Sequence, residues 1–308
     1  MKNESRAEWM VSLHGGHSGE FCDHAEGSLR EILTAAVDAG FHTFGVSEHA
    51  PRGEARFLYP EEIRRGWDAG KVAADFITYT ATLPALEEEF ADRLIVLKGF
   101  EAEVVPSNRY VRRMREYRER RAPSGRPAFD YFVGSVHYVR EEQIDGEVEA
   151  YLNAVEVCGG LEDFVRAYYR TVAEMIDKLR PDVVGHLDLV VKNARKAGFT
   201  LEAFETPQMR TAAEAALEAA RETGAILDLN TAGWRKGLPN PYPAPWLVRR
   251  ALEMNVPFCF GDDSHSPAQV GAGIADARLY LLDLGVRSIT ALTREEGSLV
   301  LKVIPLQG

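Results

Sequence analysis

The sequence predicts an α/β protein built as a distorted, TIM-like (β/α)7 barrel, in a single domain that spans residues 1–308. Three observations lead to this prediction. A short apolar run, a polar or metal-seeking residue and a helix follow one another about seven times along the chain. The apolar runs are continuous rather than alternating, as expected when helices bury both faces of a parallel sheet. A length of 308 residues is ordinary for a one-domain α/β barrel.

The first unit shows this order most clearly. Its strand, WMVSLHGGH, ends in His14 and His17 and is followed by the helix GSLREILTAAVDAG. Ser28 and Glu31 are placed to form a capping box at the start of that helix, and Gly40 provides its C-terminal stop. We therefore predict a helix soon after the opening pair of histidines.

Each later strand also ends in a side chain that can bind a metal ion or an anion. In chain order these strands and the residues that follow or end them are FHTFGVSEHAP (Glu48, His49), RLIVLKGFEAE (Glu101), FDYFVGSVHYV (His137), PDVVGHLDLV (His186), AILDLNT (Trp234, Arg235) and VPFCFGDDSH (Asp263, His265). The active site of a (β/α) barrel forms at the C-terminal ends of its strands. We therefore expect these side chains to meet at one end of the barrel.

Two of the connecting helices have clear limits in the sequence. Residues 161–179 place their apolar side chains on one helical face. An alanine-rich helix is started by Thr206 and Pro207 and ended by Gly224. Both lengths suit helices that cover the outside of a barrel.

The remaining segments are less regular. Residues 108–128 carry a run of arginines, which is typical of a solvated helix face followed by a turn. Residues 140–160 are long for a connector, and we expect them to form a lid over the site. Residues 286–308 indicate a β-hairpin or an edge strand beyond a core of about residues 10–285, and no chemistry is assigned to them.

Composition limits the class of partner. A net charge of −11 and an isoelectric point near 5.3 argue against a nucleic-acid or anionic-membrane surface, so we expect a small-molecule partner. The N-terminus lacks the apolar core of a signal peptide, and no apolar run reaches about 18 residues. The three cysteines are Cys22, Cys158 and Cys259, an odd and widely spaced set without a CxxC pair. A reducing cytoplasm is the expected location.

The histidines carry the main functional signal. Seven of the eight lie at or just beyond predicted strand ends: His14, His17, His24, His49, His137, His186 and His265. His42 lies at a strand entry instead, and we expect it to be structural. Seven separate buried imidazoles would need seven partners, whereas a shared metal cluster satisfies all of them.

Imidazoles with Glu101 and Asp263 form a ligand set for Zn²⁺, Mn²⁺ or Fe²⁺. The absence of a plausible thiolate site favours a catalytic centre over a structural one. Nine protein ligands are too many for one ion, so we expect two to three divalent ions, with three favoured. Glu101 would bridge a pair of them, as carboxylates do in multi-metal hydrolytic sites.

The order HGGHSGEFCDH, VSEHAP, GFEAE, GSVHYV, GHLDLV, LDLNTAGWRKG, GDDSH resembles the polymerase-and-histidinol-phosphatase (PHP) domain, most closely its stand-alone histidinol-phosphate phosphatases. The resemblance runs from His14 to about Pro267. It implies a distorted (β/α)7 barrel with a trinuclear site. The implied ligands are His14 and His17 as an opening pair, His24, His49 and His265 around one ion, Glu101 as a bridge, His137 and His186 around another ion, and Asp263.

The opening pair departs from the family pattern. The family usually begins with HxH, whereas two glycines separate His14 from His17 in this chain. Residues three apart on a regular strand point to opposite faces. A bulge or turn at the glycines would return His17 to the same face as His14.

Such a cluster suits hydrolysis of a phosphate monoester. We expect a hydroxide held between ions, near Glu101, Asp263 and His265, to attack phosphorus in line. The proton for the leaving alkoxide would come from a metal-bound water or from Asp263. Arg235, Lys236 and Lys192 are the candidates for binding phosphate, with Arg235 preferred for its bidentate geometry. Glu20 and Asp228 are candidates for binding a substrate amine.

The resemblance implies hydrolysis of L-histidinol phosphate in histidine biosynthesis. A second hypothesis keeps the chemistry but changes the substrate to a nucleotide or another small phosphate ester. A third is an amidohydrolase-like barrel that cleaves C–N bonds, and no strand here ends in the lysine such sites often carboxylate. A non-enzymatic metal-binding or polymerase-associated module is the last, and the acidic balance opposes it.

Overall fold

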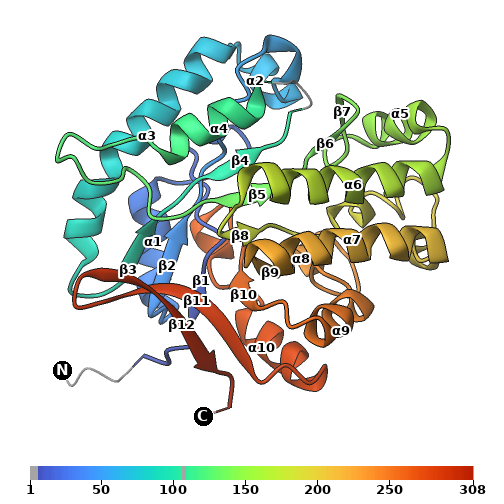
Figure 1. Ribbon diagram of the computed structural model, residues 1–308. Coiled ribbons are helices and arrows are strands. Elements are labelled where there is room, and N and C mark those ends of the chain that lie inside the picture. The colour runs from blue at the N-terminus through green and yellow to red at the C-terminus, as the bar shows by residue number, and fades with distance from the viewer. Residues whose placement is uncertain (1–5, 106–108, 308) are drawn as a thin grey trace.

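The computed structural model describes residues 6–105 and 109–307, and it has parallel strands at its centre with helices around them (Figure 1). The seven barrel strands, counting β3 and β4 as one, are β1 (Val11–Ser12), β2 (Thr43–Val46), β3 (Ile95–Lys98) with β4 (Glu101–Glu103), β5 (Val133–Ser135), β8 (Val183–Val184), β9 (Ile226–Asn230) and β10 (Phe258–Gly261). Every one of them falls within an apolar run that the sequence predicts as a strand.

The strands form two parallel sheets, ordered β1-β2-β3 and β10-β9-β8-β5-β4. The sheets are joined where β3 runs into β4, because Gly99 N still donates to Val46 O at 2.9 Å. On the other side, Leu13 N donates to Phe260 O at 2.9 Å and links β1 to β10. Neighbouring strands therefore follow chain order around a distorted barrel, and the predicted α/β class with parallel strands is confirmed.

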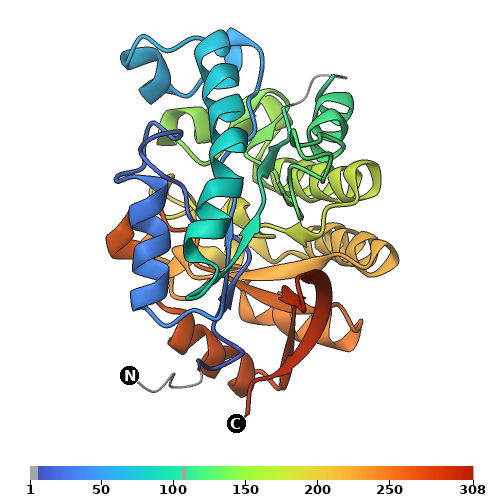
Figure 2. The ribbon, with the colours of Figure 1, turned by 90° about the vertical axis from the view of Figure 1, so that its left-hand side faces the viewer.

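The helices cover the outside of these strands. They are α1 (Leu29–Asp38), α2 (Pro60–Arg64), α3 (Ala69–Phe90), α4 (Tyr110–Arg118), α5 (Val148–Cys158), α6 (Leu161–Leu179), α7 (Pro207–Thr223), α8 (Ala232–Arg235), α9 (Pro245–Glu253) and α10 (Ile274–Asp283). The long helices α6 and α7 lie side by side (Figures 1 and 2). None of the helices in the described ranges is long and apolar enough to cross a membrane.

Local sequence signals explain where these helices begin and end. Ser28 and Glu31 form the predicted capping box of α1. The Thr206 hydroxyl accepts a hydrogen bond from Met209 N at the start of α7, and Gly224 ends that helix with a φ of +75°. The arginine-rich segment forms α4 and a turn, and its residue 108 lies outside the described residues.

Two hairpins lie at opposite ends of the barrel. β11 (Ser288–Glu295) and β12 (Ser298–Pro305) are antiparallel, and Thr293 Oγ1 lies 2.8 Å from the Oγ1 of Thr43, the first residue of β2. The hairpin therefore covers amino ends of strands, at the bottom of Figure 2. β6 (Tyr138–Val139) and β7 (Glu142–Gln143) form the second hairpin just after the carboxyl end of β5.

Candidate metal centre

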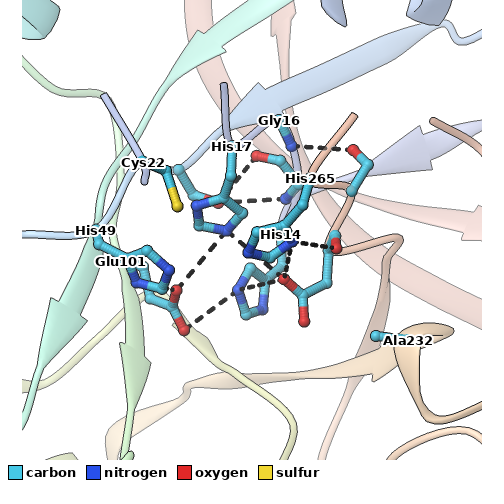
Figure 3. Close-up of polar contacts among 12 residues, drawn as sticks. His14, Gly16, His17, Cys22, His49, Glu101, Ala232 and His265 are labelled. Atoms are coloured by element: carbon cyan, nitrogen blue, oxygen red, sulfur yellow. Dashed lines mark hydrogen bonds and ion pairs between the residues drawn. The ribbon is translucent and has the colours of Figure 1, made fainter. Parts of the chain in front are cut away.

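The carboxyl ends of the barrel strands bring all nine predicted metal ligands into one cluster. Figure 3 shows the rings of His14, His17, His49 and His265 gathered near the carboxylate of Glu101. Their candidate ligand atoms fall into overlapping groups within 4.8 Å. A cavity of about 240 Å³ opens onto the cluster, which is a suitable size for a small substrate.

Glu101 lies at the centre of the cluster. Its Oε1 is 3.4 Å from His14 Nε2, 3.5 Å from His137 Nε2 and 3.2 Å from His186 Nε2. We call Glu101, His14, His137 and His186 the inner group. The other carboxylate oxygen of Glu101, Oε2, faces the opposite way and lies 3.0 Å from His49 Nδ1 and 3.8 Å from His17 Nε2. One carboxylate thus faces two sets of imidazoles, the arrangement expected of a bridging ligand.

A second set lies on loops beyond the strand ends. It consists of Cys22, His24, His49 and His265, whose candidate ligand atoms lie within 4.8 Å of one another, and we call it the outer group. The rings of His24 and His265 are stacked, with centroids 4.8 Å apart. The outer group is less buried than the inner group, since the His24 side chain is 37% exposed.

Asp263 lies between the two groups. Its Oδ1 is 3.6 Å from His17 Nε2 and 3.7 Å from His265 Nδ1. Burial by itself would raise the pKa of this carboxyl, but the neighbouring imidazoles, His14 first, hold it well below its usual value. Asp263 has a φ of +46°, and Arg235 donates to its carbonyl oxygen at 2.8 Å. The arginine therefore holds the turn that aims Asp263.

The two glycines of HGGH return His17 to the cluster. A Cβ at Gly15 would overlap the carboxylate of Asp262, and Gly16 has a φ of +75° that favours glycine. The resulting turn places the His17 ring 6.2 Å from that of His14, and both side chains are fully buried. The spacing that departs from HxH thus still delivers both imidazoles to one place.

Buried carboxylates orient the inner histidines. Asp228 Oδ2 lies 2.6 Å from His14 Nδ1, and its Oδ1 accepts from the backbone N–H of His186 at 2.6 Å. Glu103 Oε2 lies 3.2 Å from His137 Nδ1. A carboxylate on one ring nitrogen fixes the tautomer and leaves the other nitrogen free to bind a metal. Neither Asp228 nor Glu103 was predicted to have this role, because strand alternation alone does not reveal a second layer.

Several ring nitrogens in the cluster have no hydrogen-bond partner among the residues that the structure describes, and this shows whether the residues fit metal ions. His14 Nε2 and both ring nitrogens of His17 are buried without a hydrogen-bond partner in the described part of the chain. An unpaired buried polar atom costs roughly 1–3 kcal/mol, so several in one cluster require an explanation. Coordination of divalent ions by these nitrogens provides it. The donor set of imidazoles and carboxylates matches zinc, manganese or iron.

Protonation follows the same electrostatics. Burial alone would lower the pKa of His137, but the carboxylates of Glu103 and Glu101 raise it to about 9. Burial alone would raise the pKa of Glu101, and the charges of His14, His49 and His137 hold it well below its usual range. The pKa values of His14 and His49 are raised as well, so without ions the protons on these three imidazoles balance the carboxylates, and ions would displace those protons.

Cys22 is the candidate ligand that sequence analysis missed. Its side chain is buried, and Sγ lies 3.4 Å from His24 Nδ1 and 3.5 Å from His24 Nε2. Burial raises the pKa of this thiol, but His24 and then His49 lower it to about 6. The expectation that no thiolate lies near the ligands therefore does not hold. Its only signal in the sequence was the Cys-x-His spacing of FCDH.

The predicted substrate-binding residues divide into two pairs. Lys192 and Lys236 line the cavity. Arg235 does not, because α8 turns its guanidinium back to the carbonyl oxygens of Asp262 and Asp263. Glu20 is exposed, and it accepts from Leu29 N at the start of α1 rather than facing the cavity.

Acidic residues at the cavity differ from those expected for a substrate amine. The carboxylate of Asp228 contacts His14 Nδ1, and Asp228 does not line the cavity. Asp145, from the segment at residues 140–160, does line the cavity and lies 3.4 Å from Lys192 Nζ.

His42 is the one histidine that lies away from the cluster, as expected. It contacts Thr43 Oγ1 at 2.9 Å at the entry to β2.

Comparison with known proteins agrees with this geometry. The model of the PHP domain matches residues 13–232. This chain belongs to the PHP domain family. A probable histidinol-phosphatase of Deinococcus radiodurans is 33% identical to this PHP protein over 272 residues, covering 87% of this chain and 92% of the relative. A probable histidinol-phosphatase of Schizosaccharomyces pombe is 29% identical over 286 residues, covering 92% and 90%.

A solved structure shares the fold of this PHP protein. It is the histidinol phosphate phosphatase of Lactococcus lactis complexed with zinc, L-histidinol and phosphate. The two chains superpose with a TM-score of 0.67 and 21% identity, over 94% of this chain and 98% of the other. At that identity the likeness establishes the shared fold alone.

Proposed function

We propose that this protein is a metal-dependent phosphatase that hydrolyses L-histidinol phosphate to L-histidinol and phosphate, in histidine biosynthesis. The observation that carries the proposal is the convergence of seven histidines, Glu101 and Asp263 at one cavity. Curated relatives named histidinol-phosphatase, which match this chain over most of their length, support the choice of substrate.

Nine candidate ligands are too many for one ion, so we infer that the cluster would hold two to three divalent ions, with three favoured. The inner group would hold a pair of ions through Glu101, and His17 and Asp263 would complete the ligand set of that pair. The outer group would hold one further ion. Such ions supply Lewis acidity, because they neutralise phosphate oxygens and make a water more acidic. Zinc, manganese and iron all suit this donor set, and zinc is the best match for the outer group.

The chain's own residues place the substrate. Lys192 and Lys236 face the cavity and would contact the phosphate oxygens. Burial and then the charge of Lys192 lower the pKa of Lys236, so a bound anion would relieve the repulsion between the two ammonium groups. Asp145, on the same wall, would face the ammonium group of the substrate. Its present partner is Lys192, which a phosphate would draw away.

We infer that Glu101, Asp263 and His265 would lie nearest the reacting atoms. The low pKa of Asp263 favours its carboxylate form at neutral pH. In that form it carries no proton to donate to the leaving alkoxide, so it would orient the attacking water rather than act as the general acid. Arg235 acts through Asp263 by fixing its backbone, so it is a positioning residue.

Phosphate release tests the proposal. Purified protein loaded with Zn²⁺ or Mn²⁺ is assayed with histidinol phosphate, AMP and p-nitrophenyl phosphate at equal concentration. We expect kcat/KM to be highest for histidinol phosphate by at least about a hundredfold, since a site built for a polar substrate group rejects analogues without it. Equal values would leave a phosphatase of another small ester. No release from any of them would refute the phosphatase.

A further inference from the structure

We propose that Cys22 is a metal ligand, and that its thiolate joins His24, His49 and His265 to hold the ion of the outer group. This inference rests on the proposed metal centre and adds a sulfur donor to a set otherwise made of nitrogen and oxygen. It begins from the position of the residue. Cys22 is 4% exposed, lies two residues before His24, and is fixed by a hydrogen bond from its N–H to Ser18 O at 2.9 Å.

The distances suit a shared ion. Zinc binds a thiolate at about 2.3 Å and an imidazole at about 2.0–2.1 Å, so two such ligands in a tetrahedral site lie about 3.6 Å apart. Sγ of Cys22 is 3.5 Å from His24 Nε2. All four candidate atoms of the outer group lie within 4.8 Å of one another, so small side-chain rotations would bring them to one ion.

The imidazoles have nitrogens available for this ion. Both ring nitrogens of His49 are buried without a hydrogen-bond partner among the described residues. Nδ1 lies 3.0 Å and 2.9 Å from carboxylate oxygens of Glu101 and Glu103, so Nε2 is the nitrogen available to this ion. Nδ1 of His265 lies 3.0 Å from Asp263 O, which leaves Nε2 of that ring as well. Figure 3 shows the sulfur of Cys22 directed toward the rings of His17 and His49 rather than away from them.

A thiolate would make this position selective. Sulfur ligands favour zinc and other soft ions, whereas sites of carboxylates and imidazoles also accept manganese. The outer group would therefore keep a thiophilic ion when the inner group exchanges its metals. The alternative is that the thiol only donates a hydrogen bond to His24, in which case no metal–sulfur bond forms.

Cobalt substitution separates these two cases without relying on activity. The full-length protein is stripped of metal and reloaded with Co²⁺, and sulfur-to-cobalt charge-transfer absorption in the near ultraviolet is recorded together with bound cobalt per chain. The variants are Cys22→Ser, Cys22→Asp, and the matched controls Cys158→Ser and Cys259→Ser, which remove the other cysteines at the end of α5 and within β10. Circular dichroism checks that each variant folds.

We expect the wild type and both control variants to show the charge-transfer band. Cys22→Ser should lose it, and Cys22→Asp should bind cobalt at the wild-type ratio without the band, because an oxygen ligand replaces sulfur. The proposal is overturned if cobalt binds to the wild type without a sulfur band, or if the band survives in Cys22→Ser; in either case the phosphatase function still stands. Failure of the wild type to bind any cobalt would overturn both.

Discussion

The inner and outer groups of the metal centre differ in what holds their side chains. Inner residues lie on strands or directly after them, and all four are 3% exposed or less. Outer residues lie on loops, where the His265 side chain is 19% exposed and that of His24 is 37% exposed. Carboxylates behind the inner group, Asp228 and Glu103, contact its ring nitrogens. His24 also contacts a buried carboxylate, because Asp23 Oδ1 lies 3.0 Å from its Nδ1 and the Asp23 side chain is 1% exposed.

This difference predicts which group binds its metal ions more tightly and which group releases them more readily. Ligands whose backbone is fixed at a strand end lose little freedom on binding an ion. Loop ligands must be ordered by the ion itself, and that ordering lowers affinity. We therefore expect chelation to remove the outer ion first from Cys22→Ser, whereas in the wild type the sulfur ligand offsets the freedom of the loops.

The largest effect should come from Glu101, because it serves both groups at once. Glu101→Gln keeps the shape but removes the charge that faces five imidazoles. We expect kcat/KM to fall by about a thousandfold or more, on the scale of removing a preorganised charge from a reacting site. Steady-state kinetics measure the fall in kcat/KM, and elemental analysis measures the expected loss of bound metal. Glu149→Gln, on the exposed side of α5, is the matched control, and unchanged metal content in Glu101→Gln would contradict the bridging role.

A smaller effect should separate the inner group from the outer one. Asp228→Asn leaves every candidate ligand in place but removes the charge behind His14. Loss of such an orienting partner lowers metal affinity or activity by about 10- to 100-fold. Competition titration with a chromogenic chelator should show weakened inner ions and an outer ion with unchanged affinity. Equal weakening of all ions would mean that the two groups are not held independently.

The inner group was accessible from the sequence for a physical reason. Parallel strands in a barrel end at one face, so a polar residue after an apolar run predicts a position in space as well as along the chain. Glu101, His137 and His186 were identified in this way. The same signal does not reach residues that act from behind, because Glu103 and Asp228 lie inside strands, where side chains are usually read as buried structure.

The outer group and the substrate wall were less accessible. Cys22 has no cysteine partner in sequence, and two of its three imidazole neighbours, His49 and His265, come from other loops, so the Cys-x-His spacing alone does not identify it as a ligand. Arg235 follows its strand as predicted, but a short helix turns the guanidinium to the backbone of Asp263. Asp145 belongs to a segment whose length suggested a lid, and only the fold shows which of its residues face the cavity.

The cavity wall offers a test that leaves both metal groups intact. Lys192→Ala removes an ammonium group that faces the cavity and should raise KM about tenfold, since a hydrogen bond to a charged group contributes about 1.5 kcal/mol or more. Metal content should stay at the wild-type value. Lys196→Ala, an exposed lysine four residues on, is the control. A fall in kcat with unchanged KM would show that Lys192 does not bind the ground-state phosphate.

The smallest expected effect is in the number of protons released when metal ions bind to the apoprotein. The pKa of His137 is raised to about 9 in the absence of ions, so its imidazole is protonated at pH 7. A metal ligand must be neutral, so ion binding releases this proton, and affinity should increase as pH rises toward 9. Weakly buffered apoprotein titrated with Zn²⁺ should acidify, and His137→Ala should release about one proton fewer per chain. Release that does not differ between the two proteins would contradict His137 as a ligand.

The central claim is that strand-end imidazoles and carboxylates bind several ions that act together on a phosphate ester. Elemental analysis of protein purified without added metal or chelator, paired with phosphate release from histidinol phosphate on the same sample, tests it most directly. The account predicts about three transition-metal ions per chain, with hydrolysis lost in step as they are removed. Full hydrolysis by protein that carries no such ions would contradict it.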